Sequence, residues 1–437
     1  MVSNYNLIEH KVFIMKILFK NAKILTMVDD RIKEGHLVVS GNRISYIGSN
    51  LPTGMFDQVI DCDGNLLMPG FKNAHTHSAM TFLRSKADDS SLHDWLFKEI
   101  FPRENNLRAG CVKELAKVAI LEYLSSGITA VLDQYFFPQE FIDTCNEFGF
   151  RSVSLGMYDK TARPINEVLK LVEDNNYETS LNKVVIGMHA EYTGTDDMFD
   201  NTSVLLEKTK SPFYTHLSET ISEVEDCLNR RKMTPMEFFD SLHFFDRGGA
   251  IFHGVYLSDH DIELIKKHDV VVVSNPSSNM KLASGIAEIK KLLASGVTIA
   301  LGTDGPASNN ALDMFREMYL VTGLQKIKNM DPVSIPAFEV IKMATVNGAK
   351  AMGLVDADTL EVNKLADLIM IDLSRPSMQP INNIINNLVY AGGKDCVKLT
   401  MVNGKILYRD GQFFVGEDIK EIYKKVQSLT EELNVIK

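Results

Sequence analysis

The feature that most constrains the fold is a rhythm of apolar strand, loop and amphipathic helix that repeats from Pro69 onward. Strands that are apolar almost throughout are typical of parallel sheets covered on both faces. Eight such strands, each followed by a helix, predict an α/β protein with a closed (β/α)8 TIM barrel. The eight candidate segments read LMPGFKNAHTH, ITAVLDQY, RSVSLGMY, VVIGMHAEYT, PFYTHLSE, AIFHGVYL, VVVVSNPSS and TIALGTDG.

Helices are predicted between these strands. In VKELAKVAILEYLSSG, apolar residues recur three and four positions apart, and Gly127 stands where a C-terminal cap is expected. Ser258 is an expected N-cap, with Asp261 three residues later. The alternative is an open doubly wound sheet, which would favour a glycine-rich phosphate-binding turn after the first strand. The residues there are HTHSAM, so the closed barrel is favoured.

Both ends of the chain have β character. Short apolar segments run from Lys16 to Gly48 around a turn at Gly41 and Asn42, and hairpin signals recur at 403–404 (Asn-Gly) and 410–411 (Asp-Gly). We expect the two ends to form one small β-sandwich domain beside the barrel. The predicted divisions are 1–68 and 356–437 for the sandwich and 69–355 for the barrel, with a closing helix at 416–435 and an extension outside the strand pattern at 1–14.

Composition narrows the class of partner. The chain has 437 residues, 45% of them hydrophobic, and a formal net charge of -11, which disfavours nucleic acid and anionic membranes and favours a small molecule. No apolar run reaches the roughly 18 to 20 residues that span a bilayer. Five scattered cysteines without a C-x-x-C pair fit a reducing cytoplasm. Whether the chain forms a homo-oligomer is left open.

Histidines gather at the predicted strand ends. His75 and His77 are two residues apart, so both side chains face the same way at the C-terminal mouth of the barrel. Imidazoles and carboxylates are suitable ligands for zinc. The pattern therefore predicts a metal site, with histidines hydrogen-bonded in the core as the alternative. The other candidates at equivalent positions are His189, His216, His253 and Asp304.

Two acids near these strand ends are candidate proton carriers. Glu219 lies three residues beyond His216 and reaches the same mouth, where it could move a proton beside a metal-activated water. Asp304 could bind the metal and also accept the proton of that water. Its neighbours in GTDG are glycines, which allow close backbone approach.

Four further residues are candidates for contacts with a substrate. Trp95, the single tryptophan, lies in the loop after the first strand and could stack on a flat ring, while Glu104 could accept hydrogen bonds from hydroxyls. Arg151 and Arg163 flank the third strand and could meet a carboxylate or a ribose. For each of the four, a packing or surface role is the alternative.

These motifs, in this order, resemble the amidohydrolase superfamily and, within it, the 5'-methylthioadenosine/S-adenosylhomocysteine deaminases. The likeness covers nearly the whole chain, including PGFKNAHTH, HAEYT, THLSE, HGVYL, SNPSSNMKL, GTDGPASNN and KLADLI. It implies one divalent metal, usually zinc, with Fe²⁺, Mn²⁺ and Ni²⁺ as alternatives. The strand segment VVIGMHAEYT lacks the lysine of dinuclear relatives, which favours a single ion. The implied metal ligands are His75, His77, His216 and Asp304.

The resemblance also implies roles for other residues. Glu219 would protonate the purine ring nitrogen, and His253 would orient the attacking hydroxide or the developing oxyanion. Contacts to the nucleoside would come from Glu104, His189, Arg163 and Arg151. The implied reaction is hydrolytic deamination of an adenine nucleoside to its inosine analogue and ammonia. Alternatives are deamination of guanine or cytosine, triazine hydrolysis, and a non-catalytic barrel homologue.

Two positions depart from the family pattern. Glu191 stands where proline is usual, and we expect it to add charge near the pocket. Asn363 stands where glycine is usual, and asparagine tolerates a left-handed backbone.

Overall fold

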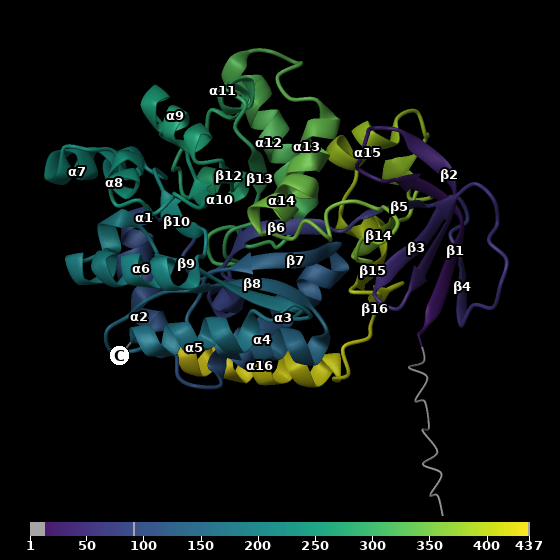
Figure 1. Ribbon diagram of the computed structural model, residues 1–437, viewed down its shortest axis with the longest axis horizontal. Helices are drawn as coiled ribbons and strands as arrows, with labels where there is room; N and C mark the ends of the chain where they lie inside the picture. The colour runs from purple at the N-terminus through teal and green to yellow at the C-terminus, as the bar shows by residue number, and fades with distance from the viewer. Residues whose placement is uncertain (1–13, 91, 436–437) are drawn as a thin grey trace, which may run out of the picture.

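The computed structural model describes residues 14–90 and 92–435 and contains two sheets. The larger body holds an eight-stranded sheet surrounded by helices, and a separate nine-stranded sheet lies at one end of it (Figure 1). The predicted extension at 1–14 lies outside the described residues except for Ile14. Within the described ranges, no helix combines the length and the apolar character that a membrane crossing requires.

The eight-stranded sheet is parallel, and its strands follow one another in chain order. At the seam between the last and first strands, the amide of Asp304 donates to the carbonyl of His75 at 3.0 Å. The predicted (β/α)8 barrel is confirmed, because each of the eight candidate segments overlaps one strand of this parallel sheet. These are β6 (Phe71–Thr76), β7 (Ile128–Asp133), β8 (Arg151–Gly156), β9 (Asn182–Gly187), β10 (Phe213–Leu217), β11 (Gly249–His253), β12 (Val270–Ser274) and β13 (Ile299–Leu301).

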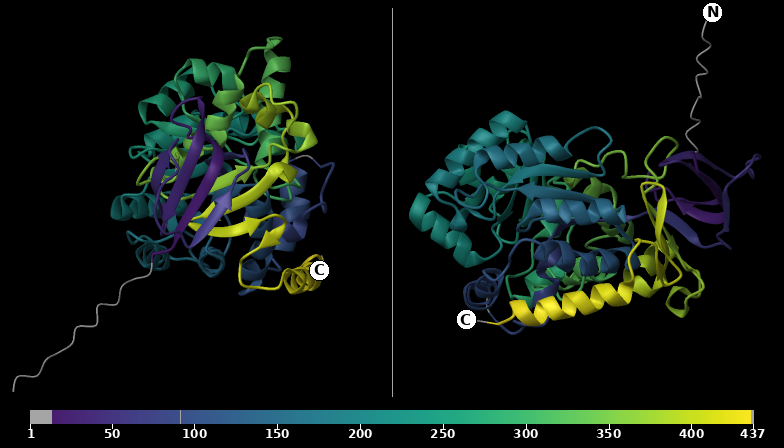
Figure 2. Two further views of the ribbon diagram at one scale, coloured as in Figure 1. Left: turned by 90° about the vertical axis from the view of Figure 1, so that its right-hand side faces the viewer. Right: turned by 90° about the horizontal axis from the view of Figure 1, so that it is seen from below.

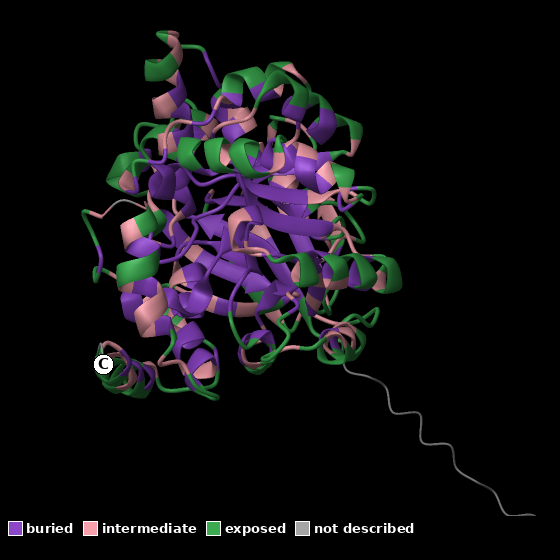
Figure 3. Cartoon of the chain, turned by 90° about the vertical axis from the view of Figure 1, so that its left-hand side faces the viewer, coloured by how far each residue is buried: buried purple, intermediate pink, exposed green. Residues whose placement is uncertain are grey.

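Helices cover the outside of the barrel, so the strands are buried while the outer helix faces are exposed (Figure 3). After β6 come η1 (Ser78–Leu83), α1 (Leu92–Asp94), η2 (Trp95–Ile100), α2 (Phe101–Glu104) and α3 (Cys111–Ser125). The next strands are followed by α4 (Pro138–Phe148), α5 (Ile165–Asn175), η3 (Glu191–Thr193), α6 (Asp196–Thr209), α7 (Ile221–Arg231) and α8 (Pro235–Ser241). The remaining barrel helices are α9 (Asp259–Lys267), α10 (Pro276–Lys281), α11 (Ile289–Ala294), α12 (Met314–Asn329), α13 (Ala337–Ala344) and α14 (Val346–Ala351).

The predicted helix ends are confirmed where the sequence had capping residues. Gly127 follows the C-cap of α3 with a φ of 81°, a conformation that glycine adopts without steric cost. At the start of α9, Ser258 Oγ accepts from the Asp261 amide at 3.0 Å, and Asp261 Oδ2 accepts from the Ser258 amide at 2.8 Å. This reciprocal pair satisfies two amides that the helix itself leaves free.

The second sheet joins the two ends of the chain and forms the β-sandwich domain. Strand β5 pairs with β1 on one side and β14 on the other, so early and late segments lie side by side in one sheet. Its strands enclose a separate apolar core that includes Phe19, Leu67 and Leu399. The strands are β1 (Lys16–Leu25), β2 (Ile32–Ser40), β3 (Arg43–Gly48), β4 (Gln58–Asp61), β5 (Leu66–Pro69), β14 (Leu368–Ile371), β15 (Val397–Val402), β16 (Lys405–Arg409) and β17 (Gln412–Phe413).

The predicted turns of this sheet are confirmed. Asn403 and Gly404 link β15 to β16 with φ angles of 50° and 76°, as a tight hairpin turn requires. Asn363, which replaces the usual glycine, has a φ of 74°, so it occupies the left-handed conformation we expected it to tolerate. The division of the chain at residues 68 and 355 stays a prediction.

The C-terminal segment returns to the barrel. After η4 (Pro376–Met378), α15 (Ile384–Tyr390) and η5 (Lys394–Cys396), the chain ends in α16 (Ile419–Leu433), which runs along the outside of the barrel (Figure 2). Lys117 of α3 forms an ion pair with Glu417 at 2.9 Å beside it. A second ion pair also connects the C-terminal part of the chain to the barrel, and it is buried: Arg151 of β8 pairs with Asp367, just before β14, at 2.6 Å.

Candidate metal centre and substrate cavity

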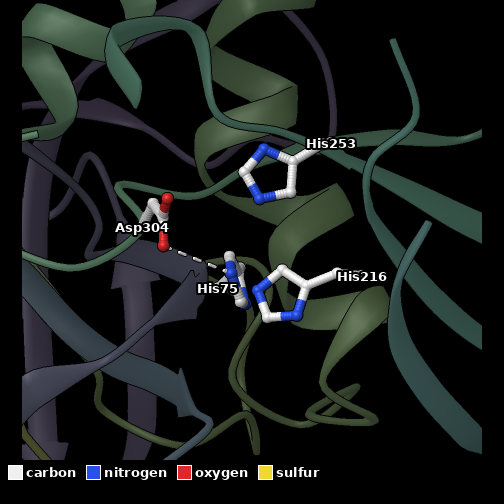
Figure 4. A group of neighbouring side chains, drawn as sticks. All are labelled: His75, His216, His253 and Asp304. Atoms are coloured by element: carbon white, nitrogen blue, oxygen red, sulfur yellow. Dashed lines mark ion pairs between the residues drawn. The ribbon is translucent and has the colours of Figure 1, made fainter. Parts of the chain in front are cut away.

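Four side chains from four different strand ends meet at the C-terminal mouth of the barrel. They are His75 near the end of β6, His216 near the end of β10, His253 at the end of β11 and Asp304 just beyond β13. All four are buried, and each offers a ligand atom within 4.8 Å of the others. Figure 4 shows the three rings and the carboxylate turned toward one another.

His77 lies directly beside this group. Its Nε2 is 3.1 Å from Asp304 Oδ1, and His75 Nε2 is 3.5 Å from the same oxygen. The Nδ1 atoms of His77 and His216 bond to the backbone carbonyls of Gln134 and His189, the latter at 2.7 Å. Because a carbonyl can only accept, both Nδ1 atoms donate, so in the neutral form of either ring the lone pair lies on Nε2.

His75 gives the clearest indication of a bound cation. Its Nδ1 and Nε2 are buried and have no hydrogen-bond partner among residues 14–90 and 92–435. Burial lowers the pKa of His75 to about 3 and also lowers that of His216, so both rings are neutral. An unsatisfied buried polar group costs roughly 1–3 kcal/mol, and a divalent ion would remove that cost. The donor set therefore fits a divalent metal.

Asp304 is held so that one oxygen is directed at the histidines. Its Oδ2 accepts from Ser278 Oγ at 2.6 Å and Ser308 Oγ at 2.8 Å, while Oδ1 faces His75 and His77. Burial alone would raise its pKa, but the two facing histidines lower it well below the usual value. The Asp304 backbone has a φ of 59°, a conformation often found at functional sites.

Glu219 and His253 form a second pair beside the metal candidates. Glu219 Oε2 is 3.7 Å from His253 Nε2, and Glu219 Oε1 accepts from Ser284 Oγ at 2.9 Å. His253 Nδ1 bonds to Asn279 Oδ1 at 2.7 Å, which fixes the ring. Burial raises the pKa of Glu219, which favours the protonated carboxyl form that a proton donor requires.

The group opens into a cavity whose wall is largely apolar and aromatic. Trp95, Glu104 and His189 lie on this wall as the sequence led us to expect, and their contact with a nucleoside stays a prediction. Trp95 Nε1 is buried with no hydrogen-bond partner among the described residues. Glu104 Oε1 accepts from Tyr135 at 2.6 Å, and burial raises the Glu104 pKa to about 7. The wall thus combines stacking surface with hydrogen-bond acceptors.

Two predicted substrate contacts do not lie on this wall. Arg151 is the first residue of β8, so it lies at the opposite end of the barrel, where its guanidinium pairs with Asp367. Arg163 lines a neighbouring cavity, and among the described residues the two cavities share Phe136 alone. The expectation for Arg151 is wrong because the start and the end of a strand open onto different faces. Arg163 lies in the loop after β8, on the same side of the barrel as the candidate metal centre, but it lines the neighbouring cavity.

Glu191 was also expected to charge the pocket, and this expectation is wrong. Its carboxylate bonds to Arg230 of α7 at 2.9 and 2.6 Å and also to the Nε of Arg231. Burial raises the pKa of Glu191, but the two arginines outweigh that effect and lower it. Glu191 therefore ties η3 to α7 instead of facing the cavity.

The sequence reasoning missed several polar residues around the site. Gln134 lies on the cavity wall, and its Nε2 donates to the Met188 carbonyl at 3.3 Å. Asn279 orients His253, and Ser284 orients Glu219. Asn279 is part of the motif SNPSSNMKL, but asparagine and serine side chains neither titrate near neutral pH nor, by themselves, indicate a metal site. Only the fold brings them to the site.

Comparisons with known proteins agree with this arrangement. The Amidohydrolase family profile matches residues 66–407. The chain is 38% identical to the 5-methylthioadenosine/S-adenosylhomocysteine deaminase of Caldanaerobacter subterraneus subsp. tengcongensis, over 96% of this chain and 99% of that protein. It is 36% identical to the 5'-deoxyadenosine deaminase of Methanobrevibacter smithii, over 95% and 98% of the two chains.

A solved structure extends the comparison to three dimensions. The adenosine deaminase from Xanthomonas campestris, with bound zinc, superposes with a TM-score of 0.90 at 29% identity, covering 96% of this chain and 98% of that one. A barrel of this kind with histidines and an aspartate at its mouth defines a class of metal-dependent hydrolases. The chain belongs to the amidohydrolase family, and the resemblance seen in its motifs is confirmed.

Proposed function

We propose that the protein hydrolytically deaminates an adenine nucleoside, releasing ammonia and leaving the inosine analogue. The observation that carries the proposal is the position of Glu219, a buried acid with a raised pKa, beside a His and Asp cluster on an aromatic cavity. Relatives named as deaminases of 5-methylthioadenosine, S-adenosylhomocysteine and 5'-deoxyadenosine support it.

The proposed metal ligands are His75, His77, His216 and Asp304. The Nδ1 atoms of His77 and His216 already donate to carbonyls, and the nitrogens of His75 have no hydrogen-bond partner among the described residues, so three Nε2 atoms can be directed at an ion. His253 instead stays beside Glu219, because Asn279 holds its Nδ1. We propose zinc, which is the ion bound in the similar adenosine deaminase structure. When bound, a divalent ion of this type activates a water for attack at neutral pH.

The proton transfers are assigned to the two acids. As water adds to the carbon that bears the amino group, Glu219 donates its carboxyl proton to the adjacent ring nitrogen. Asp304 accepts one proton from the water and passes it to the amino group, so that the carbon–nitrogen bond breaks and ammonia is released. The proton left on the added hydroxyl group then returns to Glu219 as the carbonyl of the inosine analogue forms. His253, 3.7 Å from Glu219, orients the attacking oxygen through Nε2.

The cavity wall would bind the rest of the nucleoside. Trp95 offers a face for stacking and a free Nε1–H, Glu104 offers an acceptor for ribose hydroxyls, and His189 lies on the same wall as both of them.

Steady-state ammonia release tests the proposal. The zinc-loaded protein should turn over an adenine nucleoside faster than guanine, cytosine or a chlorotriazine under the same conditions. Glu219→Gln should keep its metal and lose turnover by roughly 10²- to 10⁴-fold, while Glu207→Gln on the exposed face of α6 should behave as wild type. Release from none of the adenine nucleosides would refute the proposal, and faster release from guanine or a triazine would favour the alternative reactions.

A further inference from the structure

Gln134 has one polar atom that the protein itself leaves unused. The residue directly follows β7 on the wall of the cavity, and only 2% of its surface is exposed. Its backbone amide donates to the Thr76 carbonyl at 2.9 Å, and its backbone carbonyl accepts from His77 Nδ1. The side-chain Nε2 donates to the Met188 carbonyl at 3.3 Å. The fourth polar atom, Oε1, is buried and has no hydrogen-bond partner among the described residues.

The orientation of the Gln134 side-chain amide is set by its neighbours. A carbonyl oxygen can only accept, so the nitrogen of the amide and not its oxygen must face Met188. Nε2 is also 3.6 Å from the sulfur of Met157, another acceptor. Buried polar atoms in folded proteins nearly always have a partner. A fixed, buried acceptor without one on a cavity wall therefore indicates a ligand group that donates to it.

The chemistry of the proposed substrate limits which group can be this donor. An adenine nucleoside has donors on the amino group of the base and on the hydroxyls of the ribose. In the proposed reaction the amino group leaves beside Glu219 and Asp304, so it is engaged there. The 5' carbon of 5-methylthioadenosine or 5'-deoxyadenosine carries no donor. The 2' and 3' hydroxyls of the ribose therefore remain as donors to Gln134.

The surroundings of Gln134 agree with a contact to the ribose. Tyr135, the next residue, donates to Glu104 Oε1 at 2.6 Å, and Glu104 is the acceptor already proposed for a ribose hydroxyl. Met188, which holds the Gln134 amide, directly precedes the wall residue His189. The wall thus offers two acceptors, the second oxygen of Glu104 and Gln134 Oε1, for the two neighbouring hydroxyls of a ribose.

We infer that Gln134 is a further substrate-binding residue, whose Oε1 accepts a hydrogen bond from the 2' or the 3' hydroxyl, and that it selects against the deoxynucleoside that lacks this hydroxyl. This inference rests on the proposed adenine-nucleoside deamination and adds a specificity determinant to it. A deoxynucleoside bound in the cavity would leave Oε1 buried and unpaired, which should lower kcat/KM by roughly 10- to 100-fold.

The test measures kcat/KM of the metal-loaded full chain for adenosine, 2'-deoxyadenosine and 3'-deoxyadenosine. In the wild type, at least one deoxynucleoside should be poorer than adenosine by roughly 10- to 100-fold. Gln134→Met replaces the amide by an apolar group of similar length and should lower kcat/KM for adenosine by a similar factor. For the deoxynucleoside without the bound hydroxyl, the same variant should change kcat/KM by less than about threefold, because no contact remains to be lost. Gln427→Met, on the exposed face of α16, is the matched control and should behave as wild type.

The results that would overturn the inference are distinct from failure of the proposed function. Wild-type kcat/KM values that agree within about threefold for all three nucleosides would overturn it, and this measurement needs no variant. A Gln134→Met variant that loses nothing on adenosine would also overturn it. The same holds for a loss of equal size on all three nucleosides, because Gln134 would then support the site without contacting a hydroxyl. If the wild type deaminates no adenine nucleoside, the proposed function itself fails, whereas each of the other adverse results leaves it standing.

Discussion

Replacing Asp367 by asparagine should destabilise the protein strongly without altering its substrate site. Asp367 and Arg151 have side chains that are 0% and 5% exposed, and they are joined by two hydrogen bonds of 2.6 and 3.1 Å. The Asn403 amide also donates to Asp367 at 2.7 Å. The Asp367→Asn substitution would leave the Arg151 guanidinium buried without its counter-ion. Breaking a buried pair in this way costs about 3–5 kcal/mol.

Urea unfolding followed by far-UV circular dichroism measures the effect. Asp61→Asn serves as the control, because Asp61 forms a 2.9 Å pair with Lys20 whose side chains are 47% and 35% exposed, and the loss of such a solvent-screened pair should change the free energy of unfolding little. Burial would raise the pKa of Asp367, but Arg151 outweighs burial and lowers it. The stabilisation is therefore complete above the unfolded-state pKa of aspartate and lost as the pH falls through the lower folded-state pKa.

The Arg151–Asp367 pair also separates a structural role of Arg151 from a role in substrate binding. Arg151→Met should lower stability by a similar amount, and under folded conditions it should leave KM for a nucleoside unchanged, because Arg151 lies at the opposite end of β8 from the cavity. The reasoning is refuted if Asp367→Asn is no more costly than Asp61→Asn. It is refuted equally if Arg151→Met raises KM while stability stays as in the wild type.

Three other substitutions probe the site and its surroundings. His216→Ala should abolish stoichiometric metal retention after dialysis, measured by elemental analysis, and full occupancy would remove this residue from the ligand set. Glu104→Gln should raise KM for a nucleoside by roughly tenfold with little change in kcat, because it weakens an acceptor used in binding and not in proton transfer. Glu191→Gln should lower the free energy of unfolding by on the order of 2 kcal/mol at neutral pH, since it breaks the pairs with Arg230 and Arg231. The lowered pKa of Glu191 means that this difference should shrink on acidification, and a difference that grew would contradict the assignment.

The barrel could be predicted because its determinants are local and repeat along the chain. Continuous apolar strands, the cap at Gly127, and the capping box formed by Ser258 and Asp261 each depend on residues a few positions apart, and the same holds for the Asn403 turn of the second sheet. The strand ends then place His75 and His216 at one mouth, since parallel strands in a barrel all end on the same face. The candidate cluster followed from this geometry without any knowledge of side-chain contacts.

The polar contacts of the site could not be predicted in the same way. Glu191 turns away from the cavity because Arg230, 39 positions further on, lies beside it, and spacing does not reveal such a partner. Arg163 lies in a loop whose direction is set by backbone bonds to Asp159. The expectation for Arg151 failed for a different reason. Arg151 is the first residue of β8, and the first residue of a barrel strand lies at the end of the barrel opposite the candidate metal centre. That position could have been inferred from the sequence.

The barrel seam and the candidate metal centre depend on the same residues. Asp304 closes the seam through its amide bond to the His75 carbonyl, and its carboxylate faces the rings of His75 and His77. Gly302 lies so close to the backbone of β6 that a Cβ atom at this position would be 2.8 Å from the His75 amide nitrogen. A side chain at this position would push β13 away from β6 and move Asp304 away from its histidine partners. The glycine is therefore required both for barrel closure and for ligand geometry, which explains why strand, glycine and aspartate stand so close together in TIALGTDG.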